Sequence, residues 1–207
     1  RAGAVIEFEG RHTLPVLDQP GRLRLGLFSN VGNTANFRQV VALTQAGAFP
    51  DIGTAVAATR EPRRKSGVYL NLEQALTPDL GLFARASVND GRNESLSFTD
   101  VDGSVSGGLS LKGSAWGRPQ DTIGLGASAN RISPSHRAYF ANGGLGLLIG
   151  DGRLDRYAPE RAVEVYYALN LTKAVTMSFD YQHVESPAYN RDRGPADFFG
   201  TRLHTDF

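Results

Sequence analysis

Charged side chains recur at every second position in two neighbouring segments near the start of the chain. Glu7, Glu9 and Arg11 alternate with apolar residues, as do Arg22 and Arg24. An arginine guanidinium presents several N–H donors in a rigid fork that suits vicinal hydroxyl groups, and carboxylates accept hydrogen bonds from the same groups. These five residues predict reversible binding of a polar ligand. The alternative is a wall of mutually paired charges.

Two further cations, Arg85 and Lys112, occupy equivalent polar positions farther along the chain, and Arg85 joins Glu7, Arg22 and Arg24 as the strongest candidates for a constriction. Aromatic rings also fall among polar positions. Their faces pack on the C–H faces of pyranose rings, but packing against an infolded loop is the preferred interpretation. The rings at polar positions are Tyr69, Phe83 and Tyr166.

Motifs that support covalent chemistry are missing from the sequence. It contains neither H-E-x-x-H nor G-x-S-x-G, and its four histidines lack metal-ligand spacing. The glycines of 144–150 do not have phosphate-loop spacing. The loop aspartates could offer oxygen ligands to Ca²⁺, but they lack EF-hand spacing. We therefore expect a non-enzyme with no catalytic residue, metal or cofactor. The aspartates concerned are Asp100, Asp102, Asp151, Asp155 and Asp192.

Apolar and polar residues alternate through most of the chain. Successive side chains of a strand point to opposite faces, so this period of two predicts strands whose faces meet different surroundings. Many of the segments approach the ~9–11 residues with which a tilted strand spans a bilayer. The pattern predicts an all-β transmembrane antiparallel up-and-down barrel with about nine strands in this chain. The segments are 4–12, 22–28, 67–74, 82–89, 104–112, 122–130, 163–171, 175–182 and 199–207.

Connections between these segments alternate between short and long. Short periplasmic turns and long extracellular loops are typical of outer-membrane barrels, so we expect long extracellular loops at about 30–65 and 133–158. Within them, 36–46 and 135–142 have helical spacing, with Ser133 or Ser135 as a helix cap. An odd number of strands ending in the periplasm places the first residue near the outside. We therefore expect one barrel domain over 1–207 whose N-terminal part is missing.

Composition excludes several other classes of protein. The net charge of +1 gives no field of the kind that attracts nucleic acid, and the absence of cysteine rules out a disulfide scaffold. No apolar run approaches the ~20 residues of a membrane helix. The chain opens at Arg1 without a signal peptide, which also suggests a missing start for an exported protein.

Several motifs together resemble the carbohydrate-selective porins of the OprB type. The resemblance is dense from about residue 66 to the end and thinner before it. The motifs are NLEQ at 71–74, TPDLGLFAR at 77–85, NDG at 89–91, GLSLKG at 108–113, WGRP at 116–119, HRAY at 136–139, GGLG at 143–146, LIGDG at 148–152, YAPE at 157–160, DYQ at 180–182, PAYNRDRGP at 187–195 and RLH at 202–204.

This resemblance implies a sugar channel in the outer membrane of a Gram-negative bacterium. Such porins are barrels of about 16 strands, of which this chain would supply the C-terminal part. Sugars and outer-membrane lipid would be the partners. A final strand ending at Phe207 would be recognised by the barrel-assembly machinery. The sequence leaves open whether copies form a homo-oligomer, and it predicts no nucleic-acid partner.

Two other interpretations remain open at this point. The barrel could be a non-catalytic structural anchor or a component of polysaccharide export, in which case its lumen would be plugged. It could also be a soluble barrel with the apolar face turned inward, but many of its alanines and valines are small for a packed core. In a membrane barrel the apolar-face aromatics would contact lipid or form an interfacial girdle. Those aromatics are Tyr167, Phe179, Tyr181 and Phe207.

Overall fold

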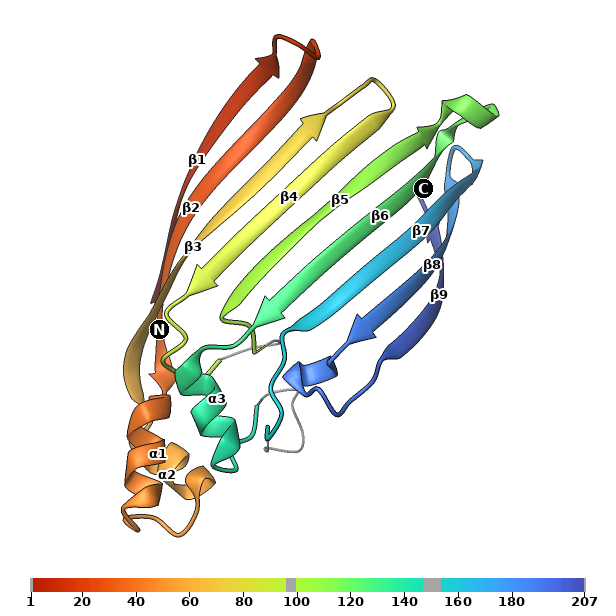
Figure 1. The fold of residues 1–207 in the computed structure, drawn as a ribbon. Helices are drawn as coiled ribbons and strands as arrows, with labels where there is room; N and C mark the ends of the chain where they lie inside the picture. Colours follow the sequence, from red (N-terminus) through yellow and green to blue (C-terminus); the bar gives the residue numbers. More distant parts are fainter. Residues whose placement is uncertain (1, 96–99, 147–153, 207) are drawn as a thin grey trace.

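The computed structural model describes residues 2–95, 100–146 and 154–206. Nine strands form one antiparallel sheet in which every strand pairs with its neighbour in sequence (Figure 1). This up-and-down order confirms the all-β fold and the predicted number of strands. The strands are β1 Ala2–Leu14, β2 Gln19–Thr34, β3 Glu61–Ala75, β4 Leu80–Asn89, β5 Gly103–Gly113, β6 Arg118–Arg131, β7 Glu160–Thr172, β8 Val175–Glu185 and β9 Ala196–Thr205.

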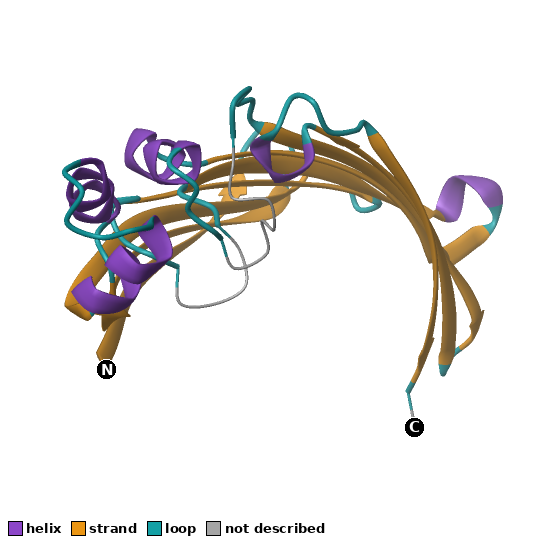
Figure 2. Cartoon of the chain, turned by 90° about the horizontal axis from the view of Figure 1, so that it is seen from below, coloured by secondary structure: helices purple, strands orange, loops and turns teal. Residues whose placement is uncertain are grey.

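The sheet curves so that its two edge strands bend toward the same side (Figure 2). A short 3-10 helix, η1 (Ser114–Trp116), lies outside the curve, and Trp116 donates from Nε1 to the Tyr167 hydroxyl at 3.1 Å. Tyr167 belongs to the apolar side-chain set, so the apolar face is convex. Large apolar side chains on this face are strongly exposed, among them Leu125 at 51% and Phe199 at 84%.

The register keeps the two side-chain sets apart across all nine strands. Leu25 of β2 lies opposite Leu70 of β3, which lies opposite Ala86 of β4, and all three point to the convex side. If the pairing of one strand shifted by one residue, its apolar side chains would move to the polar face and its polar side chains to the apolar face. The alternation of the sequence therefore specifies the register of the sheet. The two faces are called the apolar face and the polar face below.

Three helices gather at one end of the sheet (Figure 1). They are α1 Phe37–Gln45, α2 Ile52–Thr59 and α3 Pro134–Ala141. Each helix is capped at its start by a side-chain oxygen, of Asn36, Asp51 and Ser133 respectively, which accepts a hydrogen bond from the backbone N–H three residues later. This bond satisfies an otherwise unpaired amide. The predicted helices at 36–46 and 135–142 are confirmed, including the Ser133 cap, whereas α2 was not anticipated.

The predicted bounds of the first long loop were too wide. β2 continues to Thr34 and β3 begins at Glu61, so the connection is only 35–60. The strands run past the expected ends because Asn33 and Thr34 still pair with Pro62 and Glu61, although these residues break the apolar alternation. β6 also starts earlier than expected, at Arg118.

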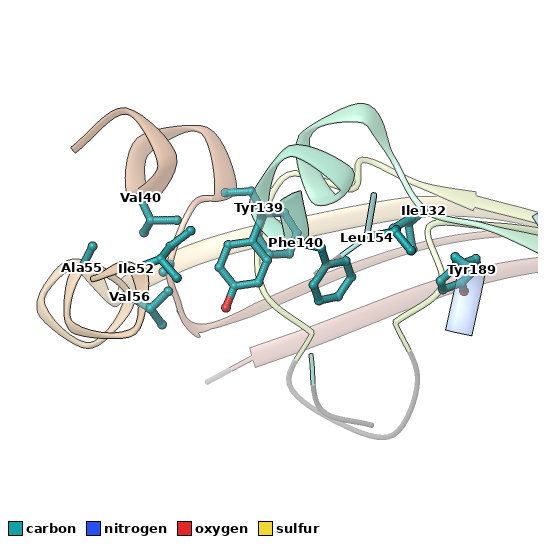
Figure 3. Packing of buried hydrophobic residues seen from close by; sticks show 11 residues of the cluster. Val40, Ile52, Ala55, Val56, Ile132, Tyr139, Phe140, Leu154 and Tyr189 are labelled. Carbon is teal, nitrogen blue, oxygen red and sulfur yellow. The ribbon is translucent and has the colours of Figure 1, made fainter. Parts of the chain in front are cut away.

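The buried apolar core lies in these loops rather than against the sheet (Figure 3). Helices α1, α2 and α3 bring their apolar residues together, and Tyr189 joins them from a second 3-10 helix, η2 (Pro187–Tyr189). Burial of each Val, Leu, Ile or Phe side chain in this cluster contributes ~1.5–3 kcal/mol, so the long loops form a packed cap. The cluster is Ala35, Phe37, Val40, Ile52, Ala55, Val56, Ile132, Tyr139, Phe140, Leu154 and Tyr189.

The chain ends follow the predicted parity. Ala2 pairs with Val31 at the end of the sheet that carries the helices, and Thr205 pairs with Val175 at the end with short turns. Strands β1 and β9 do not pair with each other, so the sheet is open at both edges. Within the described residues, no helix is long and apolar enough to cross a membrane.

Candidate functional site: the polar face of the sheet

The polar face carries all eight residues that the sequence singled out for ligand binding. One register row runs from Glu9 through Arg24 and Asn71 to Arg85, and each member lies directly opposite the next. Tyr69, Arg11 and Arg22 lie in adjacent rows on the same side, and Lys112 lies nearer the short turns. Side chains from strands far apart in the sequence therefore share one concave surface.

A charge network connects the first three strands of this surface. Arg24 donates from Nε to Oε2 of Glu9 at 2.8 Å and from one terminal nitrogen to Oε1 of Glu73 at 3.3 Å. Arg11 bonds the second oxygen of Glu9 at 2.6 Å. The Tyr69 hydroxyl donates to Glu7 at 2.6 Å, and Glu7 lies 3.9 Å from Arg24. Much of the predicted ligand set is thus mutually paired.

Glu73 is the member of this network that sequence reasoning missed. Its charge was part of the alternation of β3, but no local pattern distinguished it from other polar positions. Glu73 lies opposite Arg22 in the register. Its hydrogen bond comes from Arg24, which follows Arg22 by two residues on β2. Only the pairing of β2 with β3 could have revealed it.

Arg22, Arg85 and Lys112 stand apart from this network. Arg22 lines a cavity of about 710 Å³ near the short turns. Arg85 lies over the Phe83 ring, 5.3 Å from its centroid, an arrangement that favours cation–π attraction. Lys112 donates from Nζ to the Pro78 carbonyl at 3.1 Å, which ties it to the turn between β3 and β4.

A second cavity, of about 380 Å³, opens on the polar face over β4 to β8. Its wall combines aromatic rings with hydrogen-bonding groups and several serines. Gln182 donates from Nε2 to Oε2 of Glu164 at 3.0 Å within it. Small-molecule sites have this mixture of apolar surface and few polar groups. The lining includes Phe83, Arg85, Ser106, Glu164, Tyr166 and Gln182.

Residues 2–207 match the family described as "Carbohydrate-selective porin, OprB family". The chain belongs to this family. No curated protein matches it. OprB of Pseudomonas putida in its high-pH structure is 22% identical, with a TM-score of 0.75, and the match covers 99% of this chain and 49% of that one. The low-pH structure of the same porin gives 20% identity, a TM-score of 0.56 and coverage of 99% and 47%. The chain thus spans about half the length of these porins, whose fold it shares.

The cap of this OprB-family chain contains a buried ionic cluster. His136 is 1% exposed and lies between the rings of Phe37 and Phe140, with ring centroids 4.3 and 4.8 Å away. Its Nδ1 lies 2.8 Å from Oδ2 of Asp102, and Lys65 lies 3.8 Å from the other oxygen. On the other side of the ring, Nε2 of His136 lies 3.5 Å from Oδ1 of Asp100. The sequence offers His136 within a family motif, and both of its carboxylate partners come from a different loop.

Asp102 is held as an anion by these contacts. Burial, the largest influence, raises the pKa of its carboxyl group, but the hydrogen bond from His136, the backbone N–H of Ser133 and the charge of Lys65 together bring the pKa below its ordinary value. The same carboxylate is one of the loop aspartates that the sequence offers as oxygen ligands for Ca²⁺. Among the described residues no group of three acidic or histidine side chains could hold a metal ion. Asp151 lies outside the described residues.

Proposed function

We propose that this chain lines a passive channel through which mono- or oligosaccharides diffuse selectively across the outer membrane of a Gram-negative bacterium. The observation that carries the proposal is the separation of the two faces. Apolar side chains cover the exposed convex surface, whereas hydroxyl, amide and charged groups cover the concave one. A strand that separates lipid from a water-filled lumen needs this arrangement.

The family supports sugars as the solute, and the polar face is suited to recognise them. Arg11, Arg22, Arg24 and Arg85 offer hydrogen-bond donors, and the carboxylates around them offer acceptors. Each contact with a sugar would replace a contact with water or a neighbouring side chain, so binding would be weak. Weak binding suits flux, because a tight site would retain its solute. The channel performs no covalent chemistry in this proposal.

We further propose that the open edges β1 and β9 pair with strands outside these residues to complete one barrel domain. Unpaired backbone groups at a sheet edge are not tolerated in hydrocarbon, and the matched porins extend to about twice this chain's length. In that barrel the connections at 35–60 and 132–159 are extracellular. Recognition of the last strand by the assembly machinery remains a prediction, because Phe207 lies outside the described residues.

Aromatic pairs on the apolar face support its placement in lipid. Trp116 and Tyr167 lie toward the short turns, with ring centroids 6.4 Å apart, and Tyr181 and Phe199 lie toward the loops, 5.1 Å apart. Trp and Tyr, whose rings have one polar end, favour the two membrane–water interfaces, and each pair contains at least one of them. The two pairs therefore fit the two borders of a lipid-facing band.

Swelling of proteoliposomes tests the proposal. The complete native protein containing these residues is placed in vesicles loaded with an impermeant polymer and diluted into iso-osmotic glucose or raffinose. We expect rapid swelling in glucose and slower swelling in raffinose. Swelling in glucose no faster than that of protein-free vesicles would contradict sugar diffusion and would favour a plugged barrel acting as an anchor or export component.

A further inference from the structure

Three aromatic rings on the polar face cover glycines of the neighbouring strand. Tyr166 lies directly opposite Gly124, and a Cβ placed on that glycine would lie 2.2 Å from Cε1 of the ring. Tyr69 covers Gly26 and Phe83 covers Gly108 in the same manner, at 2.1 and 2.6 Å. The atoms of Tyr69 and Tyr166 nearest to these positions are Cε1, Cζ and the hydroxyl oxygen, so the outer part of each ring lies over the glycine backbone. The remaining surface of such a ring lies on the concave side.

The three rings differ in which groups contact the rest of their surface. The hydroxyl of Tyr69 is tied to Glu7, and the guanidinium of Arg85 lies over Phe83. Within the described residues, Tyr166 has no hydrogen bond through its hydroxyl and no partner in ring or cation stacking. It is thus the ring of this surface that is positioned by the backbone yet open to a ligand.

Hydrogen-bonding groups surround Tyr166 in the cavity of about 380 Å³. Glu164 precedes it by two positions on the same face of β7, and Gln182 lies directly opposite Glu164 on β8. The bond from Gln182 Nε2 to Glu164 Oε2, 3.0 Å long, orients the carboxylate and leaves its other oxygen to accept a further bond. An aromatic face beside an oriented carboxylate matches a ring with one C–H face and peripheral hydroxyl groups.

We infer that Tyr166, Glu164 and Gln182 form a stacking subsite for a hexopyranose. The C–H face of the sugar packs on Tyr166, and a ring hydroxyl donates to Glu164. This inference rests on the proposed sugar diffusion and assigns one place within it. An acyclic polyol of similar size has the hydroxyl groups but no flat C–H face, so the subsite discriminates against it.

Current through the complete protein in a planar bilayer tests the subsite, with glucose and mannitol as probes. In wild type, glucose reduces the ion current at lower concentration than mannitol does. Tyr166→Leu should raise the half-blocking glucose concentration about threefold or more, since aromatic stacking is lost, and should leave the mannitol value unchanged. Tyr166→Phe should keep the wild-type glucose value, because the ring face remains.

Two further variants separate the subsite from general effects on the barrel. Gly124→Ala keeps Tyr166 but places a methyl group where the ring lies, so it should weaken the glucose block as Tyr166→Leu does. Phe179→Leu removes a ring from the apolar face and should change nothing. An open-channel current equal to that of wild type shows that each variant has folded.

The outcomes distinguish the subsite from the function on which it rests. Equal half-blocking glucose concentrations in wild type and Tyr166→Leu would overturn the subsite while leaving sugar diffusion intact. A wild-type current that glucose does not reduce in preference to mannitol would also overturn the subsite. A protein that conducts no ions and admits no glucose would overturn both.

Discussion

Arg24 on β2 donates from Nε to Oε2 of Glu9 on β1 across 2.8 Å, in the middle of the polar face. The two residues are directly opposite in the register. The same guanidinium reaches Glu73 on β3, so one cation is shared between carboxylates of two flanking strands. The predicted ligand residues and the alternative of a paired wall therefore describe the same side chains.

Removal of Arg24 should change the charge that ions meet in the channel. In Arg24→Ala, the carboxylates of Glu7, Glu9 and Glu73 lose their shared cation, so cations should be favoured over anions more strongly than in wild type. The reversal potential under a salt gradient measures this preference. Arg24→Lys keeps the positive charge and should behave nearly as wild type does. If Arg24→Ala and wild type had the same reversal potential, the network would not face the conducting path.

An arginine introduced on the apolar face should lower the free energy of unfolding far more than one introduced on the polar face. Leu125 points outward and is half exposed, so Leu125→Arg places a charge against lipid and should lower the free energy of unfolding by about 2–4 kcal/mol if it lies near the midplane. Ser128→Arg, on the polar face of the same strand, is the matched control and should have a much smaller effect. Urea titration in lipid vesicles provides both values.

The reverse order of these two effects would contradict the assignment of the faces. A soluble barrel with its apolar face inward would also suffer from Leu125→Arg, but it would remain in solution without detergent or lipid. Sedimentation of the detergent-free protein therefore accompanies the titration.

The cap should loosen in acid because of Asp102. Its folded-state pKa lies below the ordinary value of 3.8, so the folded cap binds the proton less readily than the unfolded segment does. The stabilisation is complete above that ordinary value and is lost as the pH falls through the lower folded pKa. Pepsin should therefore cleave the loops of wild type increasingly fast as the pH falls below about 4.

Asp102→Asn is the control for this effect. The variant lacks the ionisable carboxyl group, so its cap should be less stable than that of wild type at neutral pH and should approach it in acid, where Asp102 is protonated. The acid-dependent increase in cleavage should therefore be smaller, after correction for pepsin's own pH profile. His136→Ala removes the imidazole ring and leaves the buried Asp102 carboxylate without its main hydrogen-bond donor. The variant should lower the stability of the cap by about 3–5 kcal/mol at neutral pH. Identical acid profiles for wild type and Asp102→Asn would show that another group governs the cap.

The sheet could be predicted from the sequence because its two faces meet different surroundings. The alternation of Val163, Val165 and Tyr167 with Glu164 and Tyr166 fixes both the strand and the direction of each side chain. Parity also predicts that the chain begins at the end of the sheet with the long loops and ends at the end with the short turns, where the structure has them. These features depend only on residues that are close in the sequence.

Contacts between distant segments could not be predicted in this way. The bond between His136 and Asp102 joins two loops 34 positions apart, and the cover of Gly124 by Tyr166 requires the register of β6 with β7. Helix α2 follows the Asp51 cap, and its buried residues Ile52, Ala55 and Val56 have helical spacing. Ala57 and Ala58 are also apolar, so the sequence shows little contrast between the faces of this helix. The apolar core of the cap could not be predicted either, because its residues come from several loops that are far apart in the sequence.

Accessibility of introduced cysteines tests most directly whether the polar face lines the sugar path. Residues 1–207 contain no cysteine, so a thiol can be placed on either side of β5. We predict that a charged methanethiosulfonate reagent lowers the current of Ser106→Cys and that glucose slows this reaction, whereas Val105→Cys keeps its current. Loss of current in Val105→Cys with no change in Ser106→Cys would contradict the account.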